Sequence, residues 1–352
     1  MDENEYERLA GALDRLPNGF PRTSTGVEIA ILRKIFSIEE AWLASLLTGQ
    51  LEPLDVLARR VGLTTEEANV RLSQMAEKGQ VWSWRVADQP GFRLAPFIVG
   101  IYEAQVDRMD HELAHLFDHY LAEGGAMGLM TPQPAFHRVI PAQQSVKSEW
   151  ILPYDEVQKI LISAKTFVLS DCICRVQQDL AGHRHCEFPV RSCLSFSSKT
   201  RDPGPHDLSK EEAIAVLEHF EEMGLVHTVS NVAQGVGYVC NCCGCCCGIL
   251  RGITQFGTEN SVAQANYFAV QDPDLCAGCG ICLGRCQVQA ISSEGGRTSV
   301  DRARCIGCGL CVSGCPQHAL ILQLKPENEK IAPPQDFADW EHLRLQNRGL
   351  IE

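Results

Sequence analysis

The residues of this chain whose types and spacing best suit chemistry are its eighteen cysteines. Residues 1–171 contain none, and all eighteen lie in residues 172–315. Thiolates bind metals and carry redox chemistry, so a reduced protein with this many cysteines is expected to use most of them in that way. They form three sets: Cys172, Cys174, Cys186 and Cys193; Cys240, Cys242, Cys243, Cys245, Cys246 and Cys247; and Cys276, Cys279, Cys282, Cys286, Cys305, Cys308, Cys311 and Cys315.

The third set contains the same pattern twice. A C-x2-C-x2-C-x3-C run begins at Cys276 and recurs from Cys305, at an offset of 29 residues. Such a run folds three thiolates around an iron–sulfur cube, while the fourth thiolate comes from elsewhere. Glycines between the ligands, such as Gly278 and Gly307, allow the tight turns that this requires. On these motifs, residues 270–324 resemble the bacterial dicluster 4Fe-4S ferredoxins.

The resemblance implies two 4Fe-4S clusters, each with ligands from both runs. One cluster is then held by Cys276, Cys279, Cys282 and Cys315, and the other by Cys305, Cys308, Cys311 and Cys286. The chain departs from the family pattern at one position, because Pro316 follows Cys315 as usual but Gln287 follows Cys286. We therefore expect a different local turn after Cys286.

The first two sets do not follow ferredoxin spacing. Their combination resembles an uncommon cysteine-rich domain of iron–sulfur oxidoreductase proteins from anaerobes. The ten thiols suffice for two further 4Fe-4S clusters with two thiols left over, and all ten are candidate ligands. Adjacent residues such as Cys242 and Cys243 project in different directions, which suggests ligands of different centres or ligands interleaved with free thiols. Two alternatives stay open: reactive or simply buried thiols, and a four-thiolate zinc site on Cys172, Cys174, Cys186 and Cys193.

Basic side chains are concentrated near the first set of cysteines. Cations close to a cluster would offset its negative charge and raise its reduction potential. A solvated basic loop, or a docking site for an acidic partner, is the alternative interpretation. The residues are Arg175, His183, Arg184, His185, Arg191, Lys199 and Arg201.

Upstream of the cysteines, apolar spacing and capping residues predict helices followed by a hairpin. The expected helices are Val27–Leu47, Pro53–Val61 and a third from Thr64 or Thr65 to Gly79, and the expected strands are Val81–Val86 and Phe92–Leu94. Asp88, Pro90 and Gly91 are expected in the turn between the strands. This order of elements resembles a winged-helix domain over residues 26–97.

Part of this pattern recurs at an offset of 145 residues. Leu63–Ala68 aligns with Leu208–Ala213, and Val81 aligns with Val226. The repeat predicts a second winged-helix-like unit between the first two cysteine sets.

Nucleic-acid binding is disfavoured by charge. The chain has a net charge of −13 and a pI of about 5.3. The candidate recognition helix, Thr65–Lys78, carries three glutamates against Arg71 and Lys78, whereas phosphate contacts require cations. We expect the winged-helix-like units to act as a scaffold or a protein-docking surface.

An H-E-x-x-H motif, the signature of helical zinc proteases, spans His111 to His115. The further ligand of such enzymes is missing, since Glu123 lies too near in sequence. An amphipathic helix over Ile101–Leu121 with solvated histidines is the favoured interpretation.

Composition bounds the fold. Hydrophobic residues make up 45% and charged residues 21% of the chain, which is typical of a globular protein. An acidic N-terminus without a signal-peptide run, and no apolar stretch of spanning length, favour the cytoplasm. We expect an α+β protein with four parts: residues 1–125, winged-helix-like; 126–268, cysteine-rich with the second winged-helix-like unit; 269–325, the two-cluster ferredoxin domain; and 326–352, a tail.

These features favour an electron-transfer protein that passes single electrons to a redox partner. An iron–sulfur reductase with its active site in residues 240–247 is the main alternative, and a cluster-based redox-sensing DNA-binding regulator is less favoured. No nucleotide or flavin motif occurs in the sequence.

Overall fold

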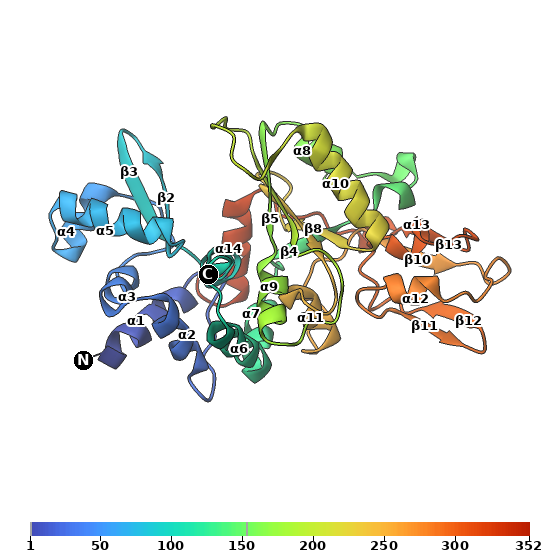
Figure 1. Cartoon of the computed structure of the whole chain (residues 1–352), viewed down its shortest axis with the longest axis horizontal. Helices are drawn as coiled ribbons and strands as arrows, with labels where there is room; N and C mark the ends of the chain where they lie inside the picture. The colour runs from blue at the N-terminus through green and yellow to red at the C-terminus, as the bar shows by residue number, and fades with distance from the viewer. Residues whose placement is uncertain (1, 153) are drawn as a thin grey trace. The chain divides into compact units, whose positions relative to one another are not determined.

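The computed structural model describes residues 2–152 and 154–352, and it confirms the expected mixture of helices and strands (Figure 1). The chain divides into two compact units. Unit 1 comprises Met1–Pro132, Val176–Gly182 and His342–Glu352, and unit 2 comprises Gln133–Arg175 and His183–Glu341. All eighteen cysteines belong to unit 2. In the described part of the chain, no helix is long and apolar enough to cross a membrane.

Unit 1 begins with helices and a small antiparallel sheet of order β1-β3-β2. The helices are α1 (Asp2–Asp14), α2 (Val27–Ile35), α3 (Ile38–Ser45), α4 (Leu54–Val61) and α5 (Thr65–Glu77), and the strands are β1 (Glu52–Pro53), β2 (Val81–Val86) and β3 (Gln89–Leu94). The single helix expected over residues 27–47 is divided into α2 and α3. The reason is a capping box at Ser37, whose side chain accepts from the Glu40 N–H while the Glu40 carboxylate accepts from the Ser37 N–H.

The hairpin of β2 and β3 is tighter than expected. Ala87 and Asp88 alone form the turn, and Ala87 has a φ of 53°. Pro90 and Gly91 were expected in the turn but belong to β3. A Cβ at Gly91 would lie 2.4 Å from the Val86 Cγ2, so the close approach of the two strands requires glycine there.

Helix α6 (His111–Tyr120) carries the H-E-x-x-H motif, and its geometry is that of an amphipathic helix. The Nε2 atoms of His111 and His115 lie 3.2 Å apart at an exposed surface, and Glu112 pairs with Lys34. Among the described residues, neither histidine belongs to a group of three potential metal ligands. The buried side chains are Leu113, Ala114, Phe117 and Tyr120. The short helix α7 (Ala126–Met130) follows.

Unit 2 contains a six-stranded antiparallel sheet of order β4-β8-β9-β6-β5-β7. Its strands are β4 (His137–Ile140), β5 (Thr166–Asp171), β6 (Arg191–Ser197), β7 (Asp207–Leu208), β8 (Val226–Ser230) and β9 (Tyr238–Cys242). Helices α8 (Val157–Leu161) and α10 (Lys210–Met223) contribute to an apolar core with Ile140, Phe167, Leu194, Val229 and Val239. Pairing of β6 with both β5 and β9 brings the first two cysteine sets together.

The repeat at an offset of 145 residues is visible in local structure. Thr64 and Ser209 both form capping boxes, at the starts of α5 and α10. Gly79 and Gly224 follow these helices with φ of 70° and 98°, which favours glycine. The surroundings differ, because β2 is an edge strand of three while β8 pairs on both sides, with β4 and β9.

The C-terminal part of unit 2 forms two antiparallel strand pairs and two short helices. Strand β10 (Tyr267–Gln271) pairs with β13 (Leu320–Leu324), and β11 (Ile291–Glu294) pairs with β12 (Arg297–Val300). Helices α12 (Ile281–Arg285) and α13 (Leu310–Ser313) lie in the two cysteine runs. The remaining helices of the cysteine-bearing part are α9 (Ile173–Leu180) and α11 (Gly248–Thr254).

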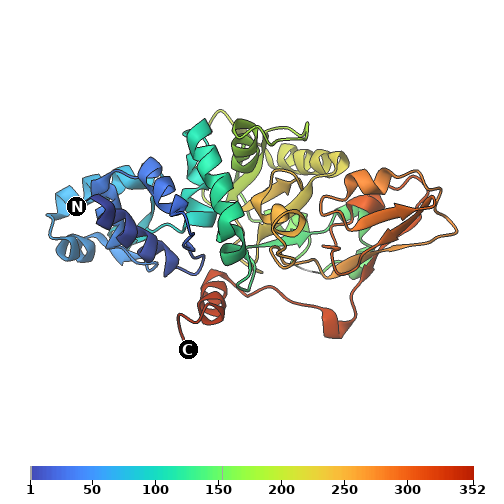
Figure 2. The same cartoon turned by 90° about the horizontal axis from the view of Figure 1, so that it is seen from below.

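After β13 a connecting segment with a 3-10 turn at Glu327–Glu329 leads to α14 (Phe337–Asn347) (Figure 2). Hydrogen bonds within unit 2 hold the segment and the start of α14: the Ala233 N–H donates to the Pro334 carbonyl, and the Trp340 indole donates to the Ala135 carbonyl at 2.9 Å.

Candidate metal centres

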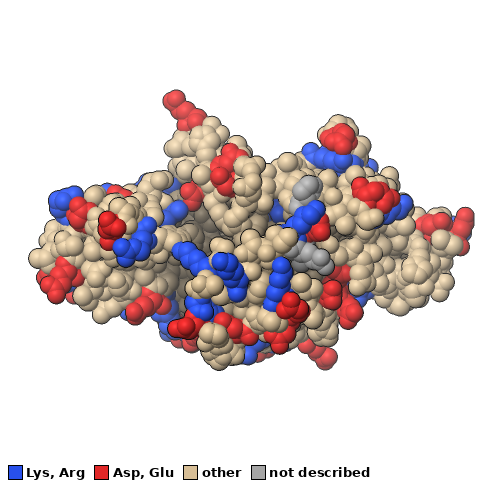
Figure 3. Space-filling model, turned by 90° about the horizontal axis from the view of Figure 1, so that it is seen from above, with Lys and Arg blue, Asp and Glu red and all other residues tan. Residues whose placement is uncertain are grey.

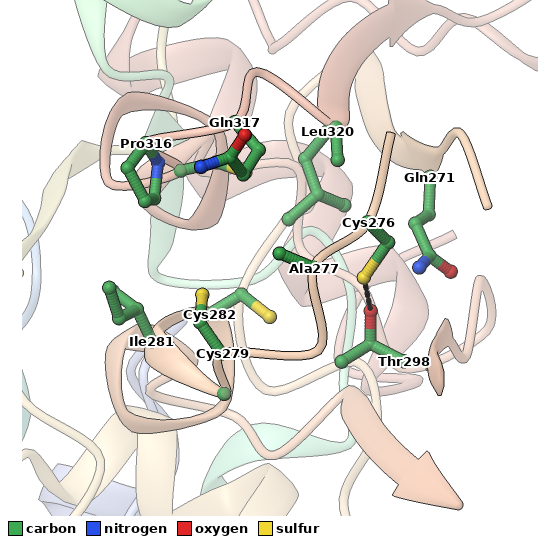
Figure 4. A pocket seen from close by; sticks show the side chains of 13 residues that line it. Gln271, Cys276, Ala277, Cys279, Ile281, Cys282, Thr298, Pro316, Gln317 and Leu320 are labelled. Carbon is green, nitrogen blue, oxygen red and sulfur yellow. Dashed lines mark hydrogen bonds between the residues drawn. The ribbon is translucent and has the colours of Figure 1, made fainter. Parts of the chain in front are cut away.

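The structure forms a small cavity beside the first cysteine run. Cys276, Cys279 and Cys282 of that run line it together with Cys315 of the other run. Figure 4 looks into this cavity and shows Cys279 and Cys282 on the side opposite Pro316. Three thiols from one run and one from the other are the combination that the sequence predicts for one cluster.

A second small cavity repeats this arrangement beside the other cysteine run. Its cysteines are Cys305, Cys308, Cys311 and Cys286. Tight turns shape both runs: Gly307 has a φ of 72°, and a Cβ there would lie 2.4 Å from the Tyr267 carbonyl oxygen. Two cavities with four thiols each fit the donor set of two iron–sulfur cubes.

Polar groups near the sulfurs distinguish the two cavities. A hydrogen bond from the Thr298 hydroxyl, 3.5 Å from Cys276 Sγ, lowers the pKa of Cys276 to about 7. In the second cavity, burial raises the pKa of Cys308 to about 12. Burial also raises the pKa of Cys286, although the Ala290 N–H donates to Cys286 Sγ at 3.1 Å. The thiols of Cys308 and Cys286 are therefore expected to ionise only as metal binds.

Four cysteines of the first two sets form what we call the compact thiol group: Cys186, Cys243, Cys245 and Cys246. Their sulfur atoms all lie within 4.8 Å of one another. Cys186 comes from the loop between α9 and β6, and the other three come from the turn between β9 and α11. Hydrogen bonds from the thiols of Cys245 and Cys246 hold the pKa of Cys243 well below its ordinary value. Sheet pairing thus unites residues more than fifty positions apart.

Four other cysteines interact in series, and we call them the ring thiol group: Cys172, Cys174, Cys242 and Cys247. The Cys174 thiol interacts with those of Cys172 and Cys247, and the Cys242 thiol interacts with that of Cys247 and, outside the group, with that of Cys240. Backbone N–H groups face three of the sulfurs: that of Arg175 faces Cys172, that of Gly248 faces Cys174, and that of Leu250 faces Cys247. Such N–H donors stabilise bound thiolates.

Cys193 and Cys240 form a cross-strand pair. They lie directly opposite each other on β6 and β9. The Phe196 N–H bonds to the Gly237 carbonyl, three positions along the same ladder. Alternation along an antiparallel ladder makes Cys193 and Cys240 a non-hydrogen-bonded pair, in which side chains approach most closely. The structure does not bring together the four thiols of the alternative zinc site, Cys172, Cys174, Cys186 and Cys193, which belong to three different groups in the described part of the chain.

Among the seven basic residues near the first set, Arg175 stands out by its burial. Its side chain is 1% exposed and donates to the carbonyls of Pro189 and Asn241 and to the Ser192 hydroxyl. Burial opposes its charge, but the neighbouring thiolates of Cys243 and Cys172 raise the pKa of Arg175. A guanidinium thus lies between the compact and ring thiol groups.

Other members of that basic set are occupied elsewhere. Arg191 pairs with Asp171 at 3.2 Å, and Arg201 pairs with Asp207 at 2.5 Å. Arg184 donates to the Cys186 carbonyl at 3.1 Å. These three arginines are therefore held by local partners. On the face shown in Figure 3, basic and acidic side chains are interspersed.

A junction that the sequence did not predict connects the two cysteine-rich regions within unit 2. The Gly244 N–H donates to Gln287 Oε1 at 2.9 Å, and Gln287 Nε2 donates to the Gly224 carbonyl at 3.0 Å. A Cβ at Gly244 would lie 2.0 Å from the Gln287 carbonyl oxygen, so only glycine fits. The available signal was the replacement of the usual proline after Cys286 by Gln287.

Comparison with known proteins identifies one region. Residues 268–316 match the family model of the 4Fe-4S dicluster domain. No curated protein and no solved structure matches the chain. The matched region contains all eight cysteines of the two cavities. The protein thus has a 4Fe-4S dicluster region near its C-terminus and a set of cysteines that supports multiple 4Fe-4S clusters and an iron–sulfur electron-transfer role.

Proposed function

We propose that this protein passes single electrons through 4Fe-4S clusters to or from a redox partner. In this proposal, Cys276, Cys279, Cys282 and Cys315 hold one cluster, and Cys305, Cys308, Cys311 and Cys286 hold the other. The observation that carries it is the pair of cavities, each lined by three thiols of one run and one of the other. A cluster held in this way exchanges electrons without binding a substrate.

A third cluster belongs to the ring thiol group in this proposal. Support comes from the interactions among the four thiols, from N–H groups directed at three of the sulfurs, and from the buried charge of Arg175. A cluster with four thiolates is an anion, so these donors and this cation stabilise it and raise its reduction potential.

The junction of Gly244 with Gln287 supplies the route between the cysteine-rich part and the dicluster region. Gln287 follows the proposed ligand Cys286, and Gly244 is two residues from the proposed ligand Cys242. The hydrogen bond between them is therefore a short connection from the second cavity to the ring thiol group.

The partner and the setting are also part of the proposal. The helices α2 to α5 with the β2–β3 hairpin would form a winged-helix-like module, and α10 with β8 and β9 a related one, both serving as scaffold or docking surfaces. The glutamates of α5 and α10 support a protein partner rather than nucleic acid. A chain with eighteen cysteines concentrated in residues 172–315 favours a reducing compartment, the cytoplasm, and an anaerobic oxidoreductase complex.

The cross-strand pair supports a second candidate function, a disulfide-type reductase. Cys193 and Cys240 face each other, and the Cys240 thiol also contacts Cys242 of the ring thiol group. Two single-electron transfers from the clusters, with two protons, would convert a Cys193–Cys240 disulfide into two thiols. A substrate disulfide would then be reduced by thiol–disulfide exchange.

Stepwise anaerobic reduction of the full-length protein tests the electron-transfer function. Three 4Fe-4S clusters accept about three electrons per chain, one each, with bleaching of visible absorption and new electron paramagnetic resonance (EPR) signals. Reoxidation by a one-electron acceptor should restore the spectrum without consuming a substrate. Uptake of no electrons would overturn the proposal, and catalytic reduction of a disulfide without a partner would favour the reductase.

A further inference from the structure

The compact thiol group differs in geometry from the other cysteines. Cys186 Sγ lies 3.8 Å from Cys243 Sγ and 3.7 Å from Cys246 Sγ. Cys245 Sγ lies 3.8 Å from Cys243 Sγ and 3.4 Å from Cys246 Sγ. In the part of the chain that the structure describes, no other three or more histidine, cysteine or acidic side chains offer ligand atoms this close together.

These distances match the coordination sphere of a single ion. Four thiolates bound tetrahedrally at about 2.3 Å to zinc are about 3.8 Å from one another. In a 4Fe-4S cube each thiolate binds a different iron at a different corner, so its four cysteine sulfurs lie farther apart. The eight dicluster cysteines form no group of three or more ligand atoms within 4.8 Å in the part of the chain that the structure describes, which fits the wider arrangement of a cube.

The surroundings of the compact thiol group suit a closed metal site. Cys243 and Cys246 are each 1% exposed. Four thiolates around a divalent ion leave two negative charges, and the buried Arg175 guanidinium, directed at Cys243, offsets one of them. The backbone N–H of Cys246 also faces Cys243. Four protein ligands leave no open position, which is typical of structural zinc sites.

We propose that Cys186, Cys243, Cys245 and Cys246 bind one structural Zn²⁺ ion in tetrahedral geometry. Binding displaces the protons of the four thiols. The ion fixes the loop of Cys186 against the turn that contains Gly244, and thereby holds the residue that contacts Gln287. This proposal goes beyond the electron-transfer function and does not depend on it.

The test uses the full chain, purified anaerobically from medium that contains both iron and zinc. We expect about one zinc per chain, and zinc-edge X-ray absorption should show four sulfur ligands at about 2.3 Å. Zinc lost to a chelator should be replaceable by Co²⁺, which would give the intense visible bands of a tetrahedral thiolate complex.

Single substitutions locate the ion. Cys245→Ser should reduce the zinc content by about fivefold or more, because a neutral hydroxyl replaces a thiolate ligand. The matched control Cys193→Ser, on the adjacent sheet, should retain zinc. A second control, Cys276→Ser, tests whether the zinc has instead replaced iron in the dicluster region. The zinc content of this variant should also be unchanged.

The variants also report on folding. The iron content and EPR signals of the dicluster region show whether Cys245→Ser is folded, and Cys186→Ser, in a loop, provides a second variant of the same group. Zinc retained in both folded variants, an iron ion in place of zinc, or four further iron atoms assigned to this group would overturn the proposal. If the wild-type protein showed no EPR signals from the dicluster region, that result would instead count against the electron-transfer function.

Discussion

Each cavity of the dicluster region is lined by four cysteines, and the compact thiol group also contains four cysteines, yet their sulfurs are spaced differently. In the dicluster region, glycine turns and short helices arrange the sulfurs around two separate cavities. In the compact thiol group, a loop and one turn bring the sulfurs to 3.4–3.8 Å along the four contacts. If both proposals hold, the spacing of the sulfurs, and not the number of cysteines, separates a cluster site from a single-ion site in this chain.

The largest predicted effect concerns which cysteines share a cluster. Cys276→Ser and Cys315→Ser should each remove about four iron atoms, and the double variant should also remove about four, because both residues serve one cluster. Combining Cys315→Ser with Cys305→Ser should remove about eight. Iron and sulfide analysis of the anaerobic proteins measures this.

Both double variants contain Cys315→Ser, so the difference in their iron content reports only on whether the second residue serves the same cluster. If the pair Cys276 and Cys315 lost about eight iron atoms, the assignment of ligands from both runs would be wrong.

The next effect concerns the buried charge of Arg175 and the reduction potential of the proposed cluster beside it. Arg175→Gln should lower the reduction potential of the ring-group cluster and leave the dicluster potentials unchanged, because a cation near a cluster favours the added electron. EPR-monitored redox titration measures both. Arg175→Lys, which retains the charge, should lie closer to the wild type, and equal shifts at all clusters would contradict the account.

A smaller effect is expected at the junction. Gly244→Ala should destabilise unit 2 by about 1–3 kcal/mol, because the added methyl group would overlap the Gln287 carbonyl and force the backbone apart. Thermal unfolding under anaerobic conditions measures the loss. Gly284→Ala is the matched control, because a Cβ at Gly284 meets no atom within 4 Å.

Electron transfer across the junction should slow in the same variant while the iron content stays constant. An unchanged unfolding midpoint and unchanged transfer rate in Gly244→Ala would show that the two regions are not coupled there.

The smallest effect is expected at the cross-strand pair. Cys193→Ser and Cys240→Ser should retain the full content of iron, sulfide and zinc, because neither belongs to the compact or ring thiol group. Metal analysis of the two variants checks this. Loss of about four iron atoms in either one would instead make it a cluster ligand.

The dicluster region could be predicted from the sequence because its cysteines follow a local spacing. The arrangement of the other cysteines could not, because it depends on strand pairing between distant residues. Each cavity receives three thiols from within seven residues, so the repeated run and the ferredoxin resemblance sufficed to predict its membership. Cys186 meets Cys243 only because β6 pairs with β9, and no local pattern encodes that pairing. The predicted position of the hairpin turn was wrong for a related reason. Pro90 and Gly91 are common turn residues, but here they lie in β3, where a Cβ at Gly91 would lie too close to the Val86 side chain.

The most direct test of the account is a joint count of iron, acid-labile sulfide and zinc in the anaerobically purified full-length protein. The account predicts about 12 iron, about 12 sulfide and about 1 zinc per chain, from three cubes and one tetrathiolate ion. A folded protein with fewer than about 8 iron atoms would contradict the clusters themselves, and about 16 iron without zinc would contradict the distinction between the two regions.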